Sequence, residues 1–202
     1  MTLLRKSVLP FLALFLFYVP AFAADNPSPQ DTVKRLLDTI GKIKTGDGLS
    51  AEEKASNQKY SDLAIAFLDL KDVSQQTLGK YWKDRTKGEQ EDFVQLLSQL
   101  FKRVAFPNSA KFFADLKSIY GESQVDKNRA VVPMKVVHQK EGEVGIDFKL
   151  DSSDGKWRVY DVVLDGVSMR NNLKSQFYKV IEQNNFAELV RRMKDKLDKA
   201  SS

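Results

Sequence analysis

Apolar residues recur every three or four positions through the first half of the chain, from Ser28 to Tyr120. This spacing is typical of amphipathic helices, which bury one stripe of side chains and expose the rest to water. It predicts successive helical stretches that begin near Ser28, Ser50, Asp69 and Thr86. The stripes of the first, third and fourth stretches are Val33, Leu36, Leu37 and Ile40; Leu70, Val73, Leu78 and Trp82; and Phe93, Leu96, Leu97, Leu100, Phe101 and Val104.

Helix-start signals stand where these stretches begin. Ser28 precedes Pro29, and both Ser50-Ala51-Glu52-Glu53 and Thr86-Lys87-Gly88-Glu89 have the form of a capping box. In a capping box, the hydroxyl and the carboxylate each bond the other residue's backbone amide, which satisfies two amides of the first helical turn. The predicted helix starts therefore have a physical basis independent of the apolar spacing.

Pro107 lies within the continuing helical pattern. Because proline has no amide hydrogen to donate, it ends or bends the fourth helix. The helical spacing resumes afterwards in Phe112, Phe113, Leu116 and Ile119 and predicts helix up to Gly121.

The periodicity changes to two between Val125 and Gly166, as expected for half-buried strands. Three strands are predicted, and the third runs from Trp157 to Leu164 with apolar residues on both faces. Turns are expected at Glu141-Gly142-Glu143 and at 151–155, and such short connections make neighbouring strands antiparallel. The inward faces of the first two strands carry Val132, Met134 and Val136, and Val144, Ile146, Phe148 and Leu150.

Helical spacing returns after Gly166 and is interrupted at Gln183-Asn184-Asn185. The stripe before the interruption contains Leu173, Phe177, Val180 and Ile181, and the stripe after it contains Phe186, Leu189, Val190, Met193 and Leu197. Helices, then an antiparallel meander, then helices that pack back on it predict a helix-rich α+β fold in one domain.

The N-terminus has the features of a secretory signal peptide. Arg5 and Lys6 precede an apolar run over residues 8–19, and Ala21-Phe22-Ala23 supplies the small residues of a cleavage site. The run is about half of the ~20 residues that a membrane-spanning helix needs. We therefore expect a cleaved signal peptide over residues 1–23, a mature domain over 24–202, and a location in the periplasm.

The composition excludes several kinds of chemistry. With no cysteine and one histidine, the chain has no disulfide or thiolate site and a poor set of ligands for zinc. A Ser-His-Asp hydrolase would need His138, and no Gly-x-Ser-x-Gly motif presents a serine. Asp161 interrupts an otherwise apolar strand, and we interpret it as a structural anchor or an acid that faces a partner, with a general base as the alternative. The sequence thus predicts a protein that is not an enzyme and holds no metal or cofactor.

The last predicted helix is rich in cations, while the net charge of +5 falls to +3 once the signal peptide is removed. These cations either contact acidic lipid headgroups or a partner, or form a solvated face that suits a helix C-terminus. The 13 phenylalanines also allow two interpretations, a filled core or a core with a cavity for lipid. The cations of this helix are Arg191, Arg192, Lys194, Lys196 and Lys199.

Several motifs resemble those of one family. They are Gly155-Lys156-Trp157-Arg158-Val159-Tyr160-Asp161-Val162, Asp165-Gly166-Val167-Ser168, Ser175-Gln176-Phe177, Leu78-Gly79-Lys80-Tyr81-Trp82 and Glu89-Gln90-x-x-Phe93. Together they are similar to the motifs of the MlaC/toluene-tolerance family of periplasmic phospholipid-binding proteins, including its hopanoid-associated branch. The chain departs from the family at Leu173 and Lys174, where an aromatic-arginine pair is common.

The resemblance implies a curved antiparallel sheet, similar to nuclear-transport-factor or cystatin-like folds, around an apolar lipid pocket. It implies a monomer that carries phospholipid between an outer-membrane lipoprotein complex and an inner-membrane ABC-type lipid transporter, and so maintains the lipid asymmetry of the outer membrane. A hopanoid-associated lipid carrier and an exported chaperone without lipid cargo are the alternatives.

The candidate lipid-binding residues are apolar side chains on helices and strands whose faces are expected to converge. They are Leu97, Leu100, Phe101, Val104, Met134, Val136, Ile146, Phe148, Val159, Val163 and Phe177. Each of them could equally belong to an ordinary filled core.

Overall fold

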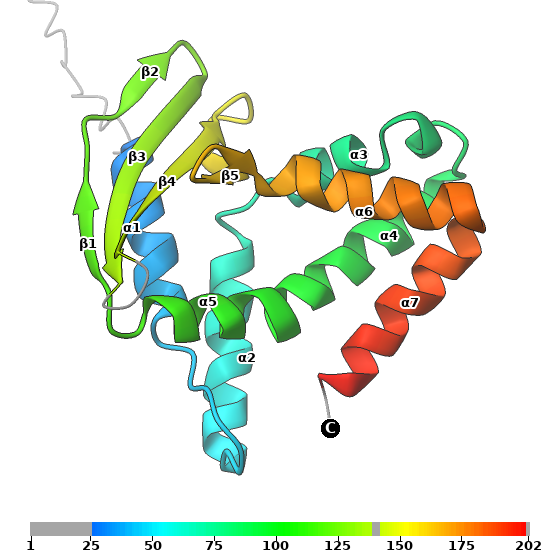
Figure 1. Cartoon of the computed structure of the whole chain (residues 1–202), viewed down its shortest axis with the longest axis horizontal. Coiled ribbons are helices and arrows are strands. Elements are labelled where there is room, and N and C mark those ends of the chain that lie inside the picture. The colour runs from blue at the N-terminus through cyan, green and yellow to red at the C-terminus, as the bar shows by residue number, and fades with distance from the viewer. Residues whose placement is uncertain (1–25, 139–141, 201–202) are drawn as a thin grey trace, which may run out of the picture.

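The computed structural model describes residues 26–138 and 142–200 (Figure 1). The expected signal peptide, residues 1–23, and Glu141 of the expected turn lie outside the described residues. Among the helices of these two ranges, none has both the length and the apolar content needed to cross a membrane.

Helices precede and follow a sheet, which confirms the predicted α+β fold. The order of elements is α1 (Pro29–Ile40), α2 (Ala51–Ile65), α3 (Leu70–Leu78), η1 (Gly79–Trp82), α4 (Lys87–Leu100), η2 (Phe101–Ala105), α5 (Phe106–Phe113), β1 (Lys117–Tyr120), β2 (Gln124–Asp126), β3 (Arg129–His138), β4 (Gly142–Asp151), β5 (Arg158–Leu164), β6 (Val167–Ser168), α6 (Met169–Gln183) and α7 (Phe186–Lys199).

The predicted helix starts are confirmed. Ser28 caps α1, and the side chains of Ser50 and Thr86 form complete capping boxes at α2 and α4. The side chain of Asn185 accepts the amide hydrogen of Glu188 at 2.9 Å and so caps α7. Because these signals are local, the sequence places the starts well.

Pro107 bends the helical path instead of ending it. The chain passes from α4 into α5 through η2, a π-helical segment in which the amide of Phe106 bonds the carbonyl of Phe101, five residues earlier. In the same pattern the carbonyl of Lys102 would face Pro107, which has no amide hydrogen. The buried hydroxyl of Ser61 donates to that carbonyl at 3.3 Å instead. The bend therefore has an identifiable cause and a partner in α2.

The prediction of helix up to Gly121 is wrong. Lys117–Tyr120 forms β1, which pairs antiparallel with β3, and Ile119 is 50% exposed because it points away from the core. The neighbouring Tyr120 is half-buried and packs against the core. Pairing with the free edge of β3 satisfies the backbone of this segment, and this tertiary contact overrides the helical spacing.

The sheet has the order β1-β3-β4-β5-β6, with β2 also paired to β3, and every strand pair is antiparallel. Its centre, β3 to β5, matches the three predicted strands, whereas β1, β2 and β6 were not predicted. β3 and β4 pair without interruption from Arg129 opposite Asp151 to His138 opposite Gly142. The predicted inward faces meet in this register, because Met134 lies opposite Ile146 and Val132 opposite Phe148.

The apolar interior is divided into two clusters. The first lies between the sheet and α1, α2 and α5, and it includes Val33, Phe106 and Leu150. The second lies between α3, α4, α6 and α7, and it includes Phe93 and Phe177. In Figure 1, α6 extends from the sheet, α4 and α5 run below it, and α7 turns back from the far end of α6.

Candidate functional site

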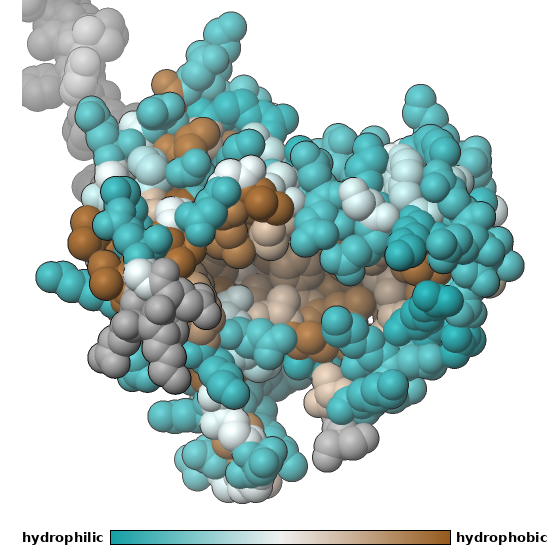
Figure 2. Space-filling model, viewed as in Figure 1, coloured by the Kyte–Doolittle hydropathy of each residue, from teal (hydrophilic) through white to brown (hydrophobic). Residues whose placement is uncertain are grey.

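Two apolar cavities lie where the two clusters meet. One has a volume of about 290 Å³ and lies between β5, the start of α3 and α6. The other has a volume of about 310 Å³ and lies between α4, η2, α6 and α7. Phe101, Leu173 and Gln176 line both, so the cavities adjoin along α6. Figure 2 shows this face of the molecule hollowed and lined with apolar residues between α6 and α4.

Phe101 stands at the junction of the cavities. It packs against both apolar clusters, and its ring centroid lies 6.0 Å from that of Phe106. Phe101 is also the first residue of the π-helical segment, in which one extra residue in the turn changes the direction of the side chains that follow. The two clusters therefore meet through Phe101 beside open apolar space.

The N-terminus of α6 is fixed to the sheet by Asp161. One carboxylate oxygen accepts the hydroxyl hydrogen of Ser168 at 2.8 Å, and the other accepts the backbone amide of Arg170 at 3.0 Å. The hydroxyl oxygen of Ser168 in turn accepts the amide of Asn171 at 3.1 Å. Asp161 is 5% exposed, so this contact satisfies a buried carboxylate and sets the position of α6 against β5.

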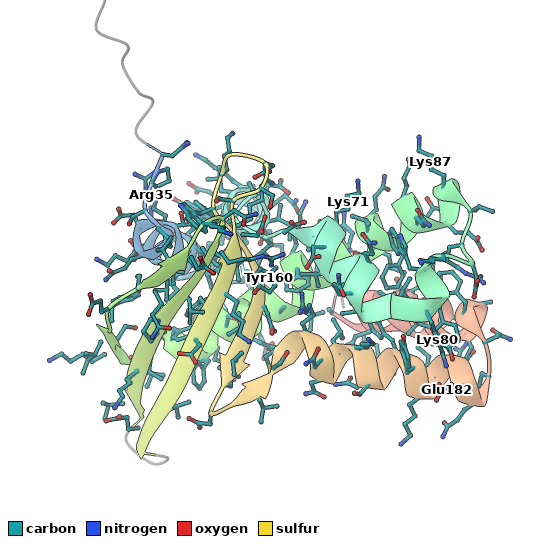
Figure 3. The ribbon with its side chains drawn as sticks, turned by 90° about the horizontal axis from the view of Figure 1, so that it is seen from above. Arg35, Lys71, Lys80, Lys87, Tyr160 and Glu182 are labelled. Carbon is teal, nitrogen blue, oxygen red and sulfur yellow. The ribbon has the colours of Figure 1, made fainter. Side chains whose placement is uncertain are left out.

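Charged side chains cover the outer end of the first cavity. The Arg170 guanidinium donates to Asp72 on α3 at 3.0 Å, and it lies 5.0 Å from the ring centre of Tyr160. Arg129 lies over the same ring at 4.6 Å. Figure 3 shows Tyr160 at the junction of the sheet and the helices. The charge of Arg170 is balanced by Asp72, so this end of the cavity presents no net positive group from Arg170.

The second cavity is bordered by charged residues of α7. Arg192 and Lys196 line it together with Leu189 and Met193. Arg192 donates to Glu188 at 2.8 Å. Hydrogen bonds from Arg191 and from Arg192 lower the pKa of the Glu188 carboxyl to about 2, so Glu188 is ionised at neutral pH.

The structure brings six of the eleven candidate residues to these two cavities. The residues are Leu97, Leu100, Phe101, Val104 and Phe177 in the cavity beside α7, and Val159 (with Phe101 again) in the cavity beside β5. Val136 and Phe148 are instead buried in the first cluster, 0% and 3% exposed. Met134 and Ile146 are also buried there, and with Val163 they line a separate cavity of about 260 Å³.

Val163 lies on the opposite face of the sheet from Val159. The pairing of β4 and β5 shifts between Lys149 and Leu150, so that Val159 pairs with Leu150 whereas Val163 pairs with Asp147. The extra residue of this bulge, Tyr160, reverses the inward and outward positions that follow it. Strict alternation along the strand predicts Val159 and Val163 on the same face of the sheet. The bulge places them on opposite faces.

Sequence reasoning missed several residues of the cavities. Leu173 and Val180 share the stripe of Phe177 on α6 and could have been nominated from that spacing. The contribution of Leu68 depends on a parallel bridge to Val159, which no local pattern indicates. The other apolar residues in this group are Val73, Ala105, Val162, Met169, Leu189 and Met193, and the polar or aromatic ones are Tyr160, Asp161, Arg170, Asn172, Gln176, Arg192 and Lys196.

The two N-terminal motifs shape the scaffold next to the cavities. The side-chain amide of Gln90 donates to the carbonyl oxygens of Trp82 and Arg85, at 3.0 and 3.2 Å. Phe93 is 1% exposed, and its ring meets Phe177 edge-on at 5.7 Å. These residues hold η1 against α4 and pack α4 against α6.

The site offers apolar surface and few reactive groups. Within residues 26–138 and 142–200, no group of three or more His, Asp or Glu side chains is placed to hold a metal ion. His138 ends β3 opposite Gly142, on a strand that lines neither of the two adjoining cavities. The geometry suits the binding of an apolar ligand.

These features define an α+β domain in which helices and an antiparallel sheet enclose adjoining apolar cavities. The family model described as MlaC protein matches residues 30–195, so the chain belongs to the MlaC family. This confirms the resemblance that the motifs indicate.

A solved structure shares the fold. It is that of a phospholipid-binding protein from Ralstonia solanacearum in complex with a phospholipid. The TM-score is 0.66 and the sequence identity 20%, and the match covers 86% of this chain and 96% of that one. At this identity the likeness shows the common fold.

Proposed function

We propose that this protein binds a phospholipid, with the acyl chains in the two adjoining cavities and the headgroup toward solvent. The observation that carries the proposal is the division of the apolar interior, because a domain of this size usually has one continuous core. Here the clusters meet beside open space lined by Phe101 and Leu173. Membership of the MlaC family and the phospholipid in the structure from Ralstonia solanacearum support the same ligand.

The free-energy cost of moving a phospholipid through water explains why such a site is needed. Each acyl methylene moved into water costs ~0.8 kcal/mol, so ~30 methylenes cost ~24 kcal/mol. A lipid therefore leaves a membrane only when apolar protein surface replaces the bilayer. Binding and release break no covalent bond, so a carrier needs a cavity and a way to open it.

The proposed role is that of a carrier in the periplasm. The signal peptide over residues 1–23 directs export, and the domain over 24–202 acts as a monomer. Phospholipid passes between an outer-membrane lipoprotein complex and an inner-membrane ABC-type lipid transporter, which maintains the lipid asymmetry of the outer membrane. Each partner must bind the open and closed forms of the protein with different affinities. A binding partner shifts the equilibrium between two forms only when it binds one of them more tightly than the other.

Lipid analysis of the purified protein tests this function. The full chain is produced in a bacterium with two membranes, and organic extracts of the mature protein are analysed by mass spectrometry. About one phospholipid per protein supports the proposal, whereas a hopanoid indicates the hopanoid-associated branch. Protein clients without lipid indicate a chaperone. The mass of the intact protein also tests cleavage after Ala23.

A matched pair of variants locates the binding site. Leu173→Glu places a charge where both cavities meet, and Leu63→Glu places the same charge on α2 at a side chain that is 50% exposed. The first variant should lose bound lipid and the second should keep it. Equal lipid content in both variants, with both folded by thermal melting, contradicts binding in these cavities.

A further inference from the structure

One face of α7 combines apolar and positive residues. Leu189, Arg192, Met193 and Lys196 follow at the spacing that places side chains on a common helix face, and all four line the cavity between α4, α6 and α7. Leu189 and Met193 are buried, whereas Arg192 and Lys196 are exposed. The two cations therefore stand at the solvent side of an apolar cavity.

The edge of the cavity where Arg192 and Lys196 stand, here called the α7 rim, keeps positive charge after the neighbouring ion pairs are counted. Arg191 is engaged by Glu188 and Asp195, each at 2.7 Å. Arg192 shares Glu188 with Arg191, and its side chain remains 50% exposed. For Lys196 no ion pair is found within residues 26–138 and 142–200. Arg192 and Lys196 are like charges four residues apart on α7, and they repel each other when no anion lies between them.

The other end of the site differs in charge. The cavity beside β5 is lined by Asp161 and Arg170, and Arg170 pairs with Asp72. An anionic group is therefore favoured at the α7 rim over the β5 end.

We infer that Arg192 and Lys196 bind the phosphate of the lipid headgroup, a phosphodiester attached to the chains in the cavity. This inference rests on the proposed function. Arginine and lysine donate hydrogen bonds to phosphate oxygens and balance their charge. A free phosphate ion offers the same chemistry without chains, and the experiment below separates the two sources.

The test uses equilibrium dialysis of the lipid-free mature protein against two short-chain lipids, dioctanoyl phosphatidylglycerol and dioctanoylglycerol. They share their acyl chains, and only the first contains a phosphate. Inorganic phosphate alone is the third ligand. The variant Arg192→Gln/Lys196→Gln is compared with Lys194→Gln/Lys199→Gln, which removes two charges from the same helix at residues that do not line the cavity.

The rim variant should bind phosphatidylglycerol about fivefold more weakly than wild type, with unchanged binding of dioctanoylglycerol. The control variant should match wild type for both lipids. Equal weakening for both lipids, or equal weakening in both variants, overturns the inference. Inorganic phosphate that binds as tightly as phosphatidylglycerol assigns the site to a free anion and also overturns it. If wild type binds neither lipid, the result contradicts the proposed function itself, which distinguishes it from a failure of the phosphate site alone.

Discussion

The hydroxyl of Tyr178 on α6 occupies the space that a Cβ atom on Gly79 would need. It accepts the backbone amide hydrogen of Lys80 at 3.0 Å. Gly79 ends α3 with a φ of +49°, a conformation that side chains rarely adopt. Nearby, Lys80 and Glu182 pair at 3.3 Å at the end of α6 that lies away from the sheet (Figure 3). A glycine of the family motif thus allows α3 and α6 to approach each other.

Gly79→Ala should lower the free energy of unfolding by about 2–4 kcal/mol, because the added methyl group strains the backbone and displaces the Tyr178 hydroxyl. Urea denaturation measures the change. Gly88→Ala is the control, since Gly88 lies within α4 and has open space around its Cβ position. It should be neutral or stabilising by up to about 1 kcal/mol. Equal effects of the two substitutions would rule out the close approach as the cause.

Asp161→Asn tests the structural role of the buried carboxylate. The amide has one acceptor oxygen where the carboxylate has two, so either Ser168 or Arg170 loses its bond. We expect the unfolding free energy to fall by about 2 kcal/mol, while the folded protein keeps its lipid. Asp154, whose side chain is 53% exposed and pairs with Arg158, provides the control, and Asp154→Asn should cost less than about 1 kcal/mol. A variant that is as stable as wild type but lacks lipid would contradict a purely structural role and indicate that the Asp161 carboxylate itself contacts the lipid.

The stability of the protein should depend on Glu188 at acidic pH. Its folded-state pKa is lowered from 4.5 to about 2 by Arg191 and Arg192, so the unfolded chain takes up the proton at higher pH than the folded one. The contribution is fully present above pH 4.5 and is lost as the pH falls through about 2. Glu188→Gln should remove this part of the pH dependence in unfolding experiments at low salt. Added salt should weaken the effect in wild type, and an unchanged slope in the variant would contradict the assignment.

Local signals in the sequence predicted most of the scaffold. The caps at Ser50 and Thr86 lie where expected, because they involve residues three positions apart. The faces of β3 and β4 also follow from simple alternation. β1 could not be predicted in this way, since Leu116 and Ile119 have helical spacing and only the free edge of β3 makes their segment a strand.

The cavities were harder to predict than the elements. The apolar stripes that contain Leu97 and Phe177 have the same residue spacing whether they face a filled core or a cavity. The spacing of apolar residues along one helix carries no information about its distance from the next helix. The bulge at Tyr160 and the bridge from Leu68 to Val159 are also long-range features. The sequence therefore indicated which faces are apolar, and the three-dimensional packing determines which of them remain uncovered.

A substitution that fills the cavity beside α7 can test lipid binding without disrupting the fold. Val104 lines the cavity beside α7, and Val104→Phe should occupy part of its 310 Å³ and reduce the bound lipid. In wild type, removal of the lipid should lower the melting temperature by roughly 5 to 10 °C, because a ligand present at 100 times its Kd stabilises the folded state by about 3 kcal/mol. The variant should show a smaller difference between its purified and lipid-free forms.

The control for this experiment is Val125→Phe on β2, where the valine is 56% exposed and lines neither of the two adjoining cavities. It should keep both the lipid and the wild-type difference in melting temperature. If Val104→Phe binds as much lipid as this control, the chains do not occupy the cavity beside α7. If the variant loses lipid and its lipid-free form melts as wild type does, the cavity is a binding site whose empty volume the fold tolerates without collapse.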